Sequence, residues 1–299
     1  MFRIRRIFDD VLPVDRYALE QVADILRSEF ESLDRRKIDR IPETLRHPLK
    51  YGARTILYVA EGYRSKFRGL ALLDHDDDLK FGFLDYLVSD SRLAGRGVGG
   101  ALYERIRNEC LALKVVGLFF ECLPDDSKLC RDPEMLKQNR ARLKFYESYG
   151  ARPITGTAYE TPVFPETDNP PYLVFDDLAQ GHALQRNYMQ KVIARILERK
   201  YKDICGPDYV QMVVDSVRDD PILIRAPHYT VPAVHHKVEK KSAAVPSKPS
   251  KIALVMTDQH EIHHVKSRGY VESPVRLRSI HEALALTGQI ELVKPAAFP

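Results

Sequence analysis

The segment 87–107, LVSDSRLAGRGVGGALYERIR, holds four glycines in six positions between an apolar run and a helical pattern: Gly95, Gly97, Gly99 and Gly100. Glycine allows the backbone to approach a ligand closely, and a helix N-terminus adds converging N–H groups and partial positive charge. Arg92 and Arg96 would reinforce that charge. The pattern predicts a phosphate-binding loop; the alternative is a tight connection that binds nothing.

Two nucleotide-binding motifs can be compared with this loop. Gly95-x-Gly97-x-x-Gly100 matches the dinucleotide fingerprint, and Glu121 stands 21 residues after Gly100, where a ribose-binding acid would be expected. However, residues 89–94 separate the strand end at Val88 from the first glycine, and that fold normally opens with its loop. The nucleoside triphosphate loop is excluded because no Lys-Ser or Lys-Thr follows the glycines.

The loop resembles the coenzyme A loop of the GNAT N-acetyltransferases, in which an apolar strand end, a short stretch and Gly-x-Gly precede a helix. A second segment, NRARLKFYESYGA at 139–151, is similar to the family's late motif through Asn139, Tyr146 and Gly150. The resemblance covers about residues 1–178. It implies acetyl-coenzyme A as cosubstrate, bound by the following residues: Leu87, Val88, Arg92, Gly95, Arg96, Gly97, Val98, Gly99, Gly100 and Asn139.

The register of the loop leaves one departure from the family pattern. If Gly97-Val98-Gly99 is the Gly-x-Gly element, Leu102 falls correctly in the helix, but Ala94 stands where the family usually has Arg or Gln. If Gly95-Arg96-Gly97 is used instead, Arg92 takes that place and the helix starts late. We favour the first register. The late motif also has Gly150-Ala151 where Gly-Phe is usual.

The resemblance further implies direct transfer of an acetyl group to a primary amine, either a protein lysine or a polyamine. Such an amine has a pKa of about 10.4 and must lose a proton before it attacks. A strand N–H near Leu87 and Val88 would stabilise the oxyanion, and Tyr146 would protonate the departing thiolate. The alternative for Tyr146 is packing on the sheet.

Two carboxylates are candidates for the base. Asp85 and Glu121 each lie inside an otherwise apolar run, FGFLDYLV and LFFECL, where a charge is costly unless it is paired or functional. The alternative for each is an acid at a strand end that faces solvent. Asn139 either bonds coenzyme A or caps a helix.

The elements that would position these residues predict an α/β (α+β) fold, a GNAT-like mixed and mostly antiparallel central sheet flanked by helices, with a C-terminal helical extension. Strands are expected at 2–8, 55–62, 68–74, 81–88, 115–123, 153–163, 172–176 and 251–257. Helices are expected at 13–30, 34–47, 100–114, 131–149, 182–201, 207–218 and 273–286.

The chain is expected to divide into an acetyltransferase-like domain (1–178), a helical extension (179–232), a flexible Lys/Ser/Ala/Pro-rich linker (233–250) and an incomplete fragment (251–299). Residues 269–288 resemble the opening of the histone deacetylase/acetylpolyamine amidohydrolase family through Glu272, Pro274, Arg276 and Leu277. This resemblance implies the N-terminal part of a fusion that continues into a deacetylase-like domain. The alternative function is therefore a non-catalytic acetyl-coenzyme A-binding module that regulates or targets a deacetylase.

Composition and charge restrict which other classes of protein the chain can belong to. The 299 residues are 44% hydrophobic and 29% charged, with a net charge of +4, which is too mild to indicate nucleic acid. The short basic runs at 35–37 and 198–202 are interpreted as solvated faces. No membrane segment or secretory signal is evident, the four cysteines show no metal-like spacing, and the histidines of HEIHH at 260–264 fit no usual metal pair. We expect a cytoplasmic protein with no metal; a homodimer is compatible with the sequence.

Overall fold

The computed structural model describes residues 2–30, 35–63, 66–89, 97–163, 169–230, 252–255 and 290–293. The chain forms two compact units, Met1–Pro232 and Ala233–Pro299. Residues 179–232 therefore belong to the same unit as the region that carries the predicted site. The finer division at residue 178 stays a prediction, and the linker at 233–250 lies outside the described residues.

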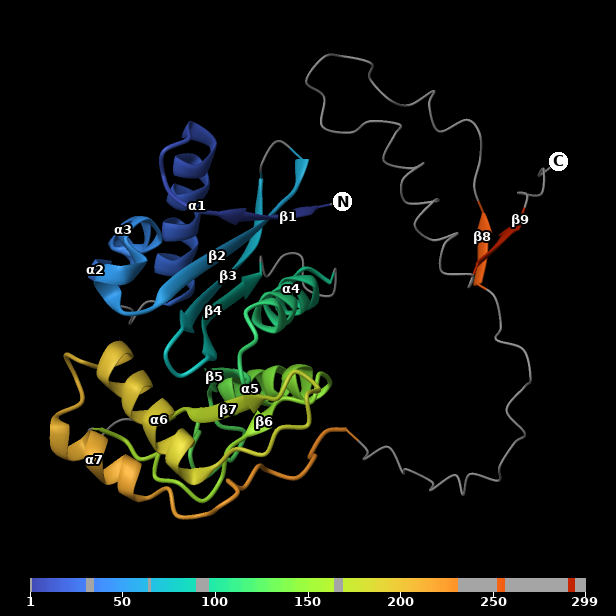
Figure 1. Ribbon diagram of the computed structural model, residues 1–299. Helices are drawn as coiled ribbons and strands as arrows, with labels where there is room; N and C mark the ends of the chain where they lie inside the picture. The colour runs from blue at the N-terminus through green and yellow to red at the C-terminus, as the bar shows by residue number, and fades with distance from the viewer. Residues whose placement is uncertain are drawn as a thin grey trace, which may run out of the picture. The chain divides into compact units, whose positions relative to one another are not determined.

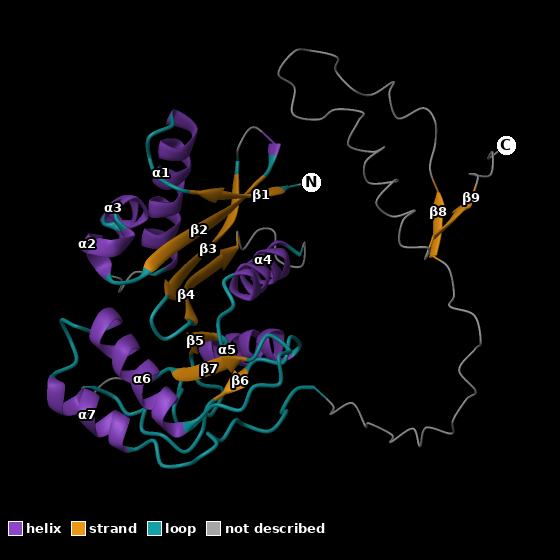
Figure 2. Ribbon diagram, in the orientation of Figure 1, coloured by secondary structure: helices purple, strands orange, loops and turns teal. Residues whose placement is uncertain are grey.

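A seven-stranded sheet forms the centre of the first unit (Figures 1 and 2). Its strand order is β1-β2-β3-β4-β5-β7-β6, and only the β4–β5 pair is parallel. The strands are β1 (Arg3–Ile7), β2 (Arg54–Glu61), β3 (Phe67–Asp76), β4 (Phe81–Ser89), β5 (Leu118–Cys122), β6 (Arg152–Pro153) and β7 (Tyr172–Asp176). The second unit contains one parallel pair, β8 (Ile252–Val255) with β9 (Ile290–Val293).

Helices cover both faces of the sheet. They are α1 (Pro13–Glu29), α2 (Arg35–Asp39), α3 (Ile41–Arg46), the 3-10 helix η1 (Pro48–Tyr51), α4 (Val98–Ala112), α5 (Pro133–Glu147), α6 (Arg186–Lys200) and α7 (Pro207–Asp215). One face, called the α4 face here, packs on α4 and α5 through side chains such as Ile56 and Phe120. The opposite face, called the α6 face, packs on α1–α3 at β1–β4 and on α6–α7 towards β5–β7 (Figure 1).

The local reasons for these elements are visible in the sequence. Leu19, Val22 and Leu26 recur at helical spacing on α1 and are buried against the sheet, while Pro13 stands at the helix start, where its missing N–H costs nothing. In β2, residues 56–61 are all buried, because both faces of this strand are covered. The predicted fold class, a mixed and mostly antiparallel sheet flanked by helices, is confirmed.

Several element boundaries differ from the sequence prediction, three of them with a clear local cause. The single helix expected at 34–47 is two helices: α2 ends at Asp39 and α3 begins at Ile41, because Pro42 lacks an N–H and disfavours a continuous helix through the preceding residues. The strand expected at 153–163 was mostly wrong: only Arg152–Pro153 forms β6, and the chain turns at Gly156, whose φ is +74°. The third difference is the start of α4, which lies at Val98 and not at Gly100 and forms part of the candidate site.

Candidate functional site

Strands β4 and β5 part partway along their length. They pair through Gly82–Leu118, Phe83–Phe119 and Leu84–Phe120, but β4 continues to Ser89 and β5 to Cys122. We call this opening the split. Two neighbouring strands that separate leave backbone N–H and C=O groups without ladder partners, so the split can bind an extended polar chain. Leu87 and Val88 lie on the part of β4 that borders it.

Asp85 lies at a bulge at the apex of the split. On the other side of β4, Leu72 of β3 pairs with Tyr86 and Leu73 pairs with Leu84, so Asp85 is the extra residue. A bulge places consecutive side chains on one face of a strand and re-aims them. Asp85 follows Phe83 by two positions and so lies on the same α6 face, where its carboxylate contacts α6, and the bulge adds Tyr86 to that face.

Helix α4 begins beside the end of β4. Gly97 is its N-cap, with a left-handed φ of +76°, and the first helical bond runs from the Ala101 N–H to the Gly97 carbonyl. The helix thus starts at Val98 and not at Gly100, because glycine adopts this conformation without steric cost. A helix leaves its first N–H groups unpaired, here those of the turn Val98–Gly100.

The glycines of that turn leave room for close approach. A Cβ at Gly97 would meet no described atom within 4 Å, and one at Gly99 would lie 3.8 Å from the Ser89 hydroxyl at the end of β4. One at Gly100 would lie 3.1 Å from the Tyr149 hydroxyl. Tyr149 is a neighbour of this turn that the sequence analysis missed, although it falls inside the late motif. The loop residues Arg92, Gly95 and Arg96 lie outside the described residues.

Tyr146 stands on the α4 face of the split. Its ring packs 4.4 Å from Phe120, the last β5 residue that pairs with β4, and 5.1 Å from Tyr103 of α4. The side chain is only 7% exposed, and burial raises the pKa of its hydroxyl. It therefore stays protonated at physiological pH and can donate a hydrogen bond.

Asn139 is buried in the middle of α5. Its amide donates to the Pro124 carbonyl at 2.9 Å, which anchors the chain after β5. Helix α5 is capped instead by Asp132, whose carboxylate accepts from the Glu134 and Met135 N–H groups, so the capping alternative for Asn139 is wrong. The contribution of Asn139 to coenzyme A binding stays a prediction.

The α6 face of the split holds a part-buried ionic cluster. The Lys200 ammonium, at the end of α6, lies 2.7 Å from Asp85 on β4 and 2.9 Å from Glu121 on β5. Glu121 also accepts hydrogen bonds of 2.7 Å from Tyr159 and from Tyr201, one at each carboxylate oxygen. The two carboxylates that the sequence singled out are thus brought together, and a lysine joins them across the split.

Electrostatics keep Glu121 and Lys200 ionised. Burial acts to raise the pKa of Glu121, but the Lys200 charge and the two tyrosine hydroxyls outweigh it and hold the pKa below its usual range. Burial acts to lower the pKa of Lys200, but Asp85 and Glu121 outweigh it and hold that pKa well above its usual range.

Lys200 was not among the residues predicted from the sequence. The run ERKYK at 198–202 was expected to be a solvated face, but the Lys200 side chain is only 23% exposed. A charge run by itself does not reveal which of its members points inward. One signal was available: Lys200 follows Ile196 by four positions, so it continues the buried stripe of α6.

Asp74 on β3 is a second acid that the sequence analysis did not select. It accepts a hydrogen bond of 2.8 Å from Thr55, and burial together with the neighbouring Asp85 raises its pKa to about 6. Next to it, Arg195 and Arg199 of α6 both pair with the buried Asp76, at 2.9 and 2.8 Å. These pairs attach α6 to the sheet beside the split.

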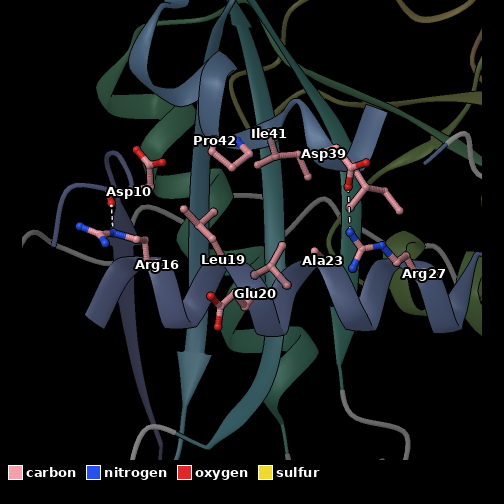
Figure 3. Close-up of a pocket in the computed structure, with 11 residues that line it drawn as sticks. Asp10, Arg16, Leu19, Glu20, Ala23, Arg27, Asp39, Ile41 and Pro42 are labelled. Atoms are coloured by element: carbon pink, nitrogen blue, oxygen red, sulfur yellow. Dashed lines mark hydrogen bonds and ion pairs between the residues drawn. The ribbon is translucent and has the colours of Figure 1, made fainter. Parts of the chain in front are cut away.

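A separate cavity of about 250 Å³ lies between α1 and the α2–α3 segment (Figure 3). Its wall is apolar at Leu19 and Ile41, and an ion pair of 2.8 Å between Arg27 and Asp39 spans one end. None of the predicted site residues that the structure describes lines this cavity, so it is distinct from the split.

Other predicted chemistry falls mostly outside the described part of the chain. This is the case for Glu272, Pro274, Arg276, Leu277 and the histidines at 260–264. Within the described residues, no group of three or more His, Cys, Asp or Glu side chains could hold a metal ion, and no helix is long and apolar enough to cross a membrane. The four cysteines are free thiols, and Cys110, Cys122 and Cys130 are buried.

Several solved structures show similarity to this chain. An acetyltransferase of the GNAT family from Staphylococcus aureus is 19% identical, with 60% of this chain and 99% of that chain covered and a TM-score of 0.41. An aminoglycoside 6'-N-acetyltransferase complexed with coenzyme A is 17% identical, with 60% and 99% covered and a TM-score of 0.43. An acetyltransferase from Streptococcus agalactiae is 18% identical, with 58% and 97% covered and a TM-score of 0.41.

No family model matches this chain, and no curated protein does. The identities of these three structures are below 20% and their TM-scores are below 0.5, so they do not indicate the activity or the substrate of this chain. The function proposed for this protein rests on its own residues.

Proposed function

We propose that this protein is an acetyl-coenzyme A-dependent N-acetyltransferase that acts on a primary amine by direct attack in a ternary complex. The observation that carries the proposal is the split: β4 and β5 stop pairing after Leu84 and Phe120, and the glycine-capped start of α4 lies beside the end of β4. An extended pantetheine chain suits unpaired strand groups, and a pyrophosphate suits a helix N-terminus.

The residues present fit coenzyme A. The open space around Gly97 would admit the pyrophosphate, and the N–H groups of residues 98–100 would bind it. Leu87 and Val88 border the split, where a backbone N–H would stabilise the oxyanion. Arg92 and Arg96 complete the proposed loop and would contribute positive charge.

Acetyl transfer needs one bond formed and one broken. The amine nitrogen forms a bond to the thioester carbonyl carbon, the carbon–sulfur bond breaks, and the sulfur leaves as thiolate. The nitrogen loses a proton, for which Asp85 and Glu121 are the nearby acceptors on the α6 face. Tyr146, on the α4 face, would donate to the thiolate. A thioester at the apex of the split would thus lie between the two carboxylates, on the side of the amine, and Tyr146, on the side of the leaving thiolate.

One observation favours the second candidate, a module that binds acetyl-coenzyme A without catalysis. Both candidate bases are already paired with Lys200, and Glu121 accepts two tyrosine hydroxyls as well. If these carboxylates stay paired and never accept a proton from an amine, the site would bind acetyl-coenzyme A but release no thiol.

Calorimetry with acetyl-coenzyme A and, in parallel, NADH tests the proposed ligand. We expect saturable binding of acetyl-coenzyme A and none of NADH; binding of NADH alone would support the dinucleotide alternative instead. Thiol release with a panel of amines then separates the two candidates. Turnover supports the enzyme, whereas tight binding without turnover for every amine supports the module.

A further inference from the structure

The position of Lys200 bears on which amines the site can accept, given the proposed acetyl transfer. Asp85 and Glu121 directly follow Leu84 and Phe120, the last paired residues of β4 and β5, and both carboxylates lie on the α6 face. The Lys200 ammonium joins them at 2.7 and 2.9 Å. An internal ammonium thus occupies the place where an ammonium substrate would form its ion pairs.

Three of the four oxygens of these two carboxylates already have a partner. One oxygen of Glu121 accepts from Tyr159, and the other accepts from Tyr201 and contacts Lys200. The oxygen Oδ1 of Asp85 accepts from Lys200. An incoming ammonium would have to displace Lys200 or approach it, and two cations in a part-buried site repel strongly.

Further positive charge surrounds the same point. Lys37 of α2 donates to the Lys200 carbonyl at 2.6 Å, which brings a second ammonium to the end of α6. The titratable and charged groups that face Lys200 are Asp74 on β3, Asp85 and Tyr86 on β4, Glu121 on β5, Tyr159, Arg199 on α6, Tyr201, and Lys37 on α2. Among them, Asp85 and Glu121 are paired with Lys200 itself, Asp74 accepts from Thr55, and Arg199 is paired with Asp76.

We propose that Lys200 is a specificity-determining residue that excludes ammonium acceptors and selects amines that are uncharged near neutral pH. Such an amine needs no deprotonation before attack. Its nitrogen becomes acidic only after the bond to the acetyl carbon forms, and then a carboxylate held ionised by Lys200 is a sufficient acceptor. Lysine side chains and polyamines, which the sequence analysis expected, are therefore disfavoured.

Two peptides provide the probes: one with a free α-amine and no lysine, and one with a blocked N-terminus and a single lysine. At pH 7.5 roughly a third of α-amines are uncharged, against roughly one lysine side chain in a thousand. The quantity measured is the ratio of kcat/KM for the two peptides, by thiol release at saturating acetyl-coenzyme A. The difference in solution pKa between the amines of the two peptides is the same for every variant, so it cancels when the ratio is compared between wild type and variants.

We expect wild type to prefer the α-amine peptide by more than about tenfold, and Lys200→Met to move the ratio towards the lysine peptide by about tenfold or more, because the freed carboxylates then attract a cation. Lys200→Arg keeps the charge and should keep the ratio. Lys191→Met, on an exposed position of the same helix, is the matched control and should also keep it. If Lys200→Met fails to fold by circular dichroism, Lys200→Gln carries the same expectation.

A wild-type preference for the lysine peptide, or a ratio that Lys200→Met and Lys200→Gln leave unchanged, would overturn the proposal. Turnover of neither peptide by a protein that binds acetyl-coenzyme A would overturn it as well. Failure of acetyl-coenzyme A to bind would instead refute the proposed function, so the two failures are distinguishable.

Discussion

Replacing Tyr146 by phenylalanine tests how the leaving group is stabilised. Tyr146 packs against Phe120 at the apex of the split, and burial keeps its hydroxyl protonated by raising its pKa. A coenzyme A thiol has a pKa near that of cysteine, about 8.5, so the thiolate would not take the proton completely from a less acidic tyrosine. The hydroxyl should act as a hydrogen-bond donor to the thiolate.

The size of the effect follows from that role. A hydrogen bond to a charged group contributes about 1.5–3 kcal/mol, which corresponds to a loss of roughly 10- to 150-fold in kcat for Tyr146→Phe. Full proton transfer by a general acid would instead give losses of about 10²–10⁴. Affinity for acetyl-coenzyme A should change little, because the thiolate charge develops only during the reaction.

The assay combines thiol release against pH with calorimetry of acetyl-coenzyme A. Because the raised pKa keeps Tyr146 protonated, wild-type activity should show no alkaline decline from this group up to about pH 10. Tyr188→Phe is the matched control: its hydroxyl is buried on α6, away from the split, and has no hydrogen-bond partner among the described residues. Unchanged kcat in Tyr146→Phe would refute the reasoning and favour the packing role alone.

Two further predictions concern the elements around the site. Glu147 of α5 accepts from the N–H groups of His228, Tyr229 and Thr230 at 2.7–3.0 Å, so Glu147→Gln should lower the free energy of unfolding by about 2–3 kcal/mol at pH 7 in urea denaturation. Burial acts to raise the pKa of Glu147, but those N–H groups outweigh it and lower the pKa. The difference in unfolding free energy between wild type and variant should therefore be full above about pH 4.3 and shrink as the pH falls through the lowered pKa. A difference that does not depend on pH would contradict this. Gly97→Ala places a side chain at a φ of +76°, so we expect a loss of about 1–2 kcal/mol in the free energy of unfolding. It also places a methyl group in the proposed phosphate site, so the affinity for acetyl-coenzyme A should fall about tenfold. An unchanged affinity by calorimetry would show that Gly97 is not part of that site.

Much of the fold was predictable because its signals are local. Leu19, Val22 and Leu26 recur with the helical period, and the strand runs are apolar because the sheet is covered on both faces. The glycine-rich start of α4 was also predictable, since only the left-handed conformation of Gly97 moved the boundary by two residues. Each of these features depends on residues close together in the chain.

The arrangement of the site depended on contacts that no local pattern encodes. That β4 and β5 part after Leu84 and Phe120 is a property of their pairing, and it places Tyr146 on one face and the two carboxylates on the other. Lys200 reaches Asp85 from 115 positions away, and only the packing of α6 on the sheet buries it there. The sequence by itself therefore determined most of the elements, the glycine-rich start of α4 and the candidate acids. The tertiary structure decided which charges meet, because burial and pairing depend on neighbours that are distant in the chain.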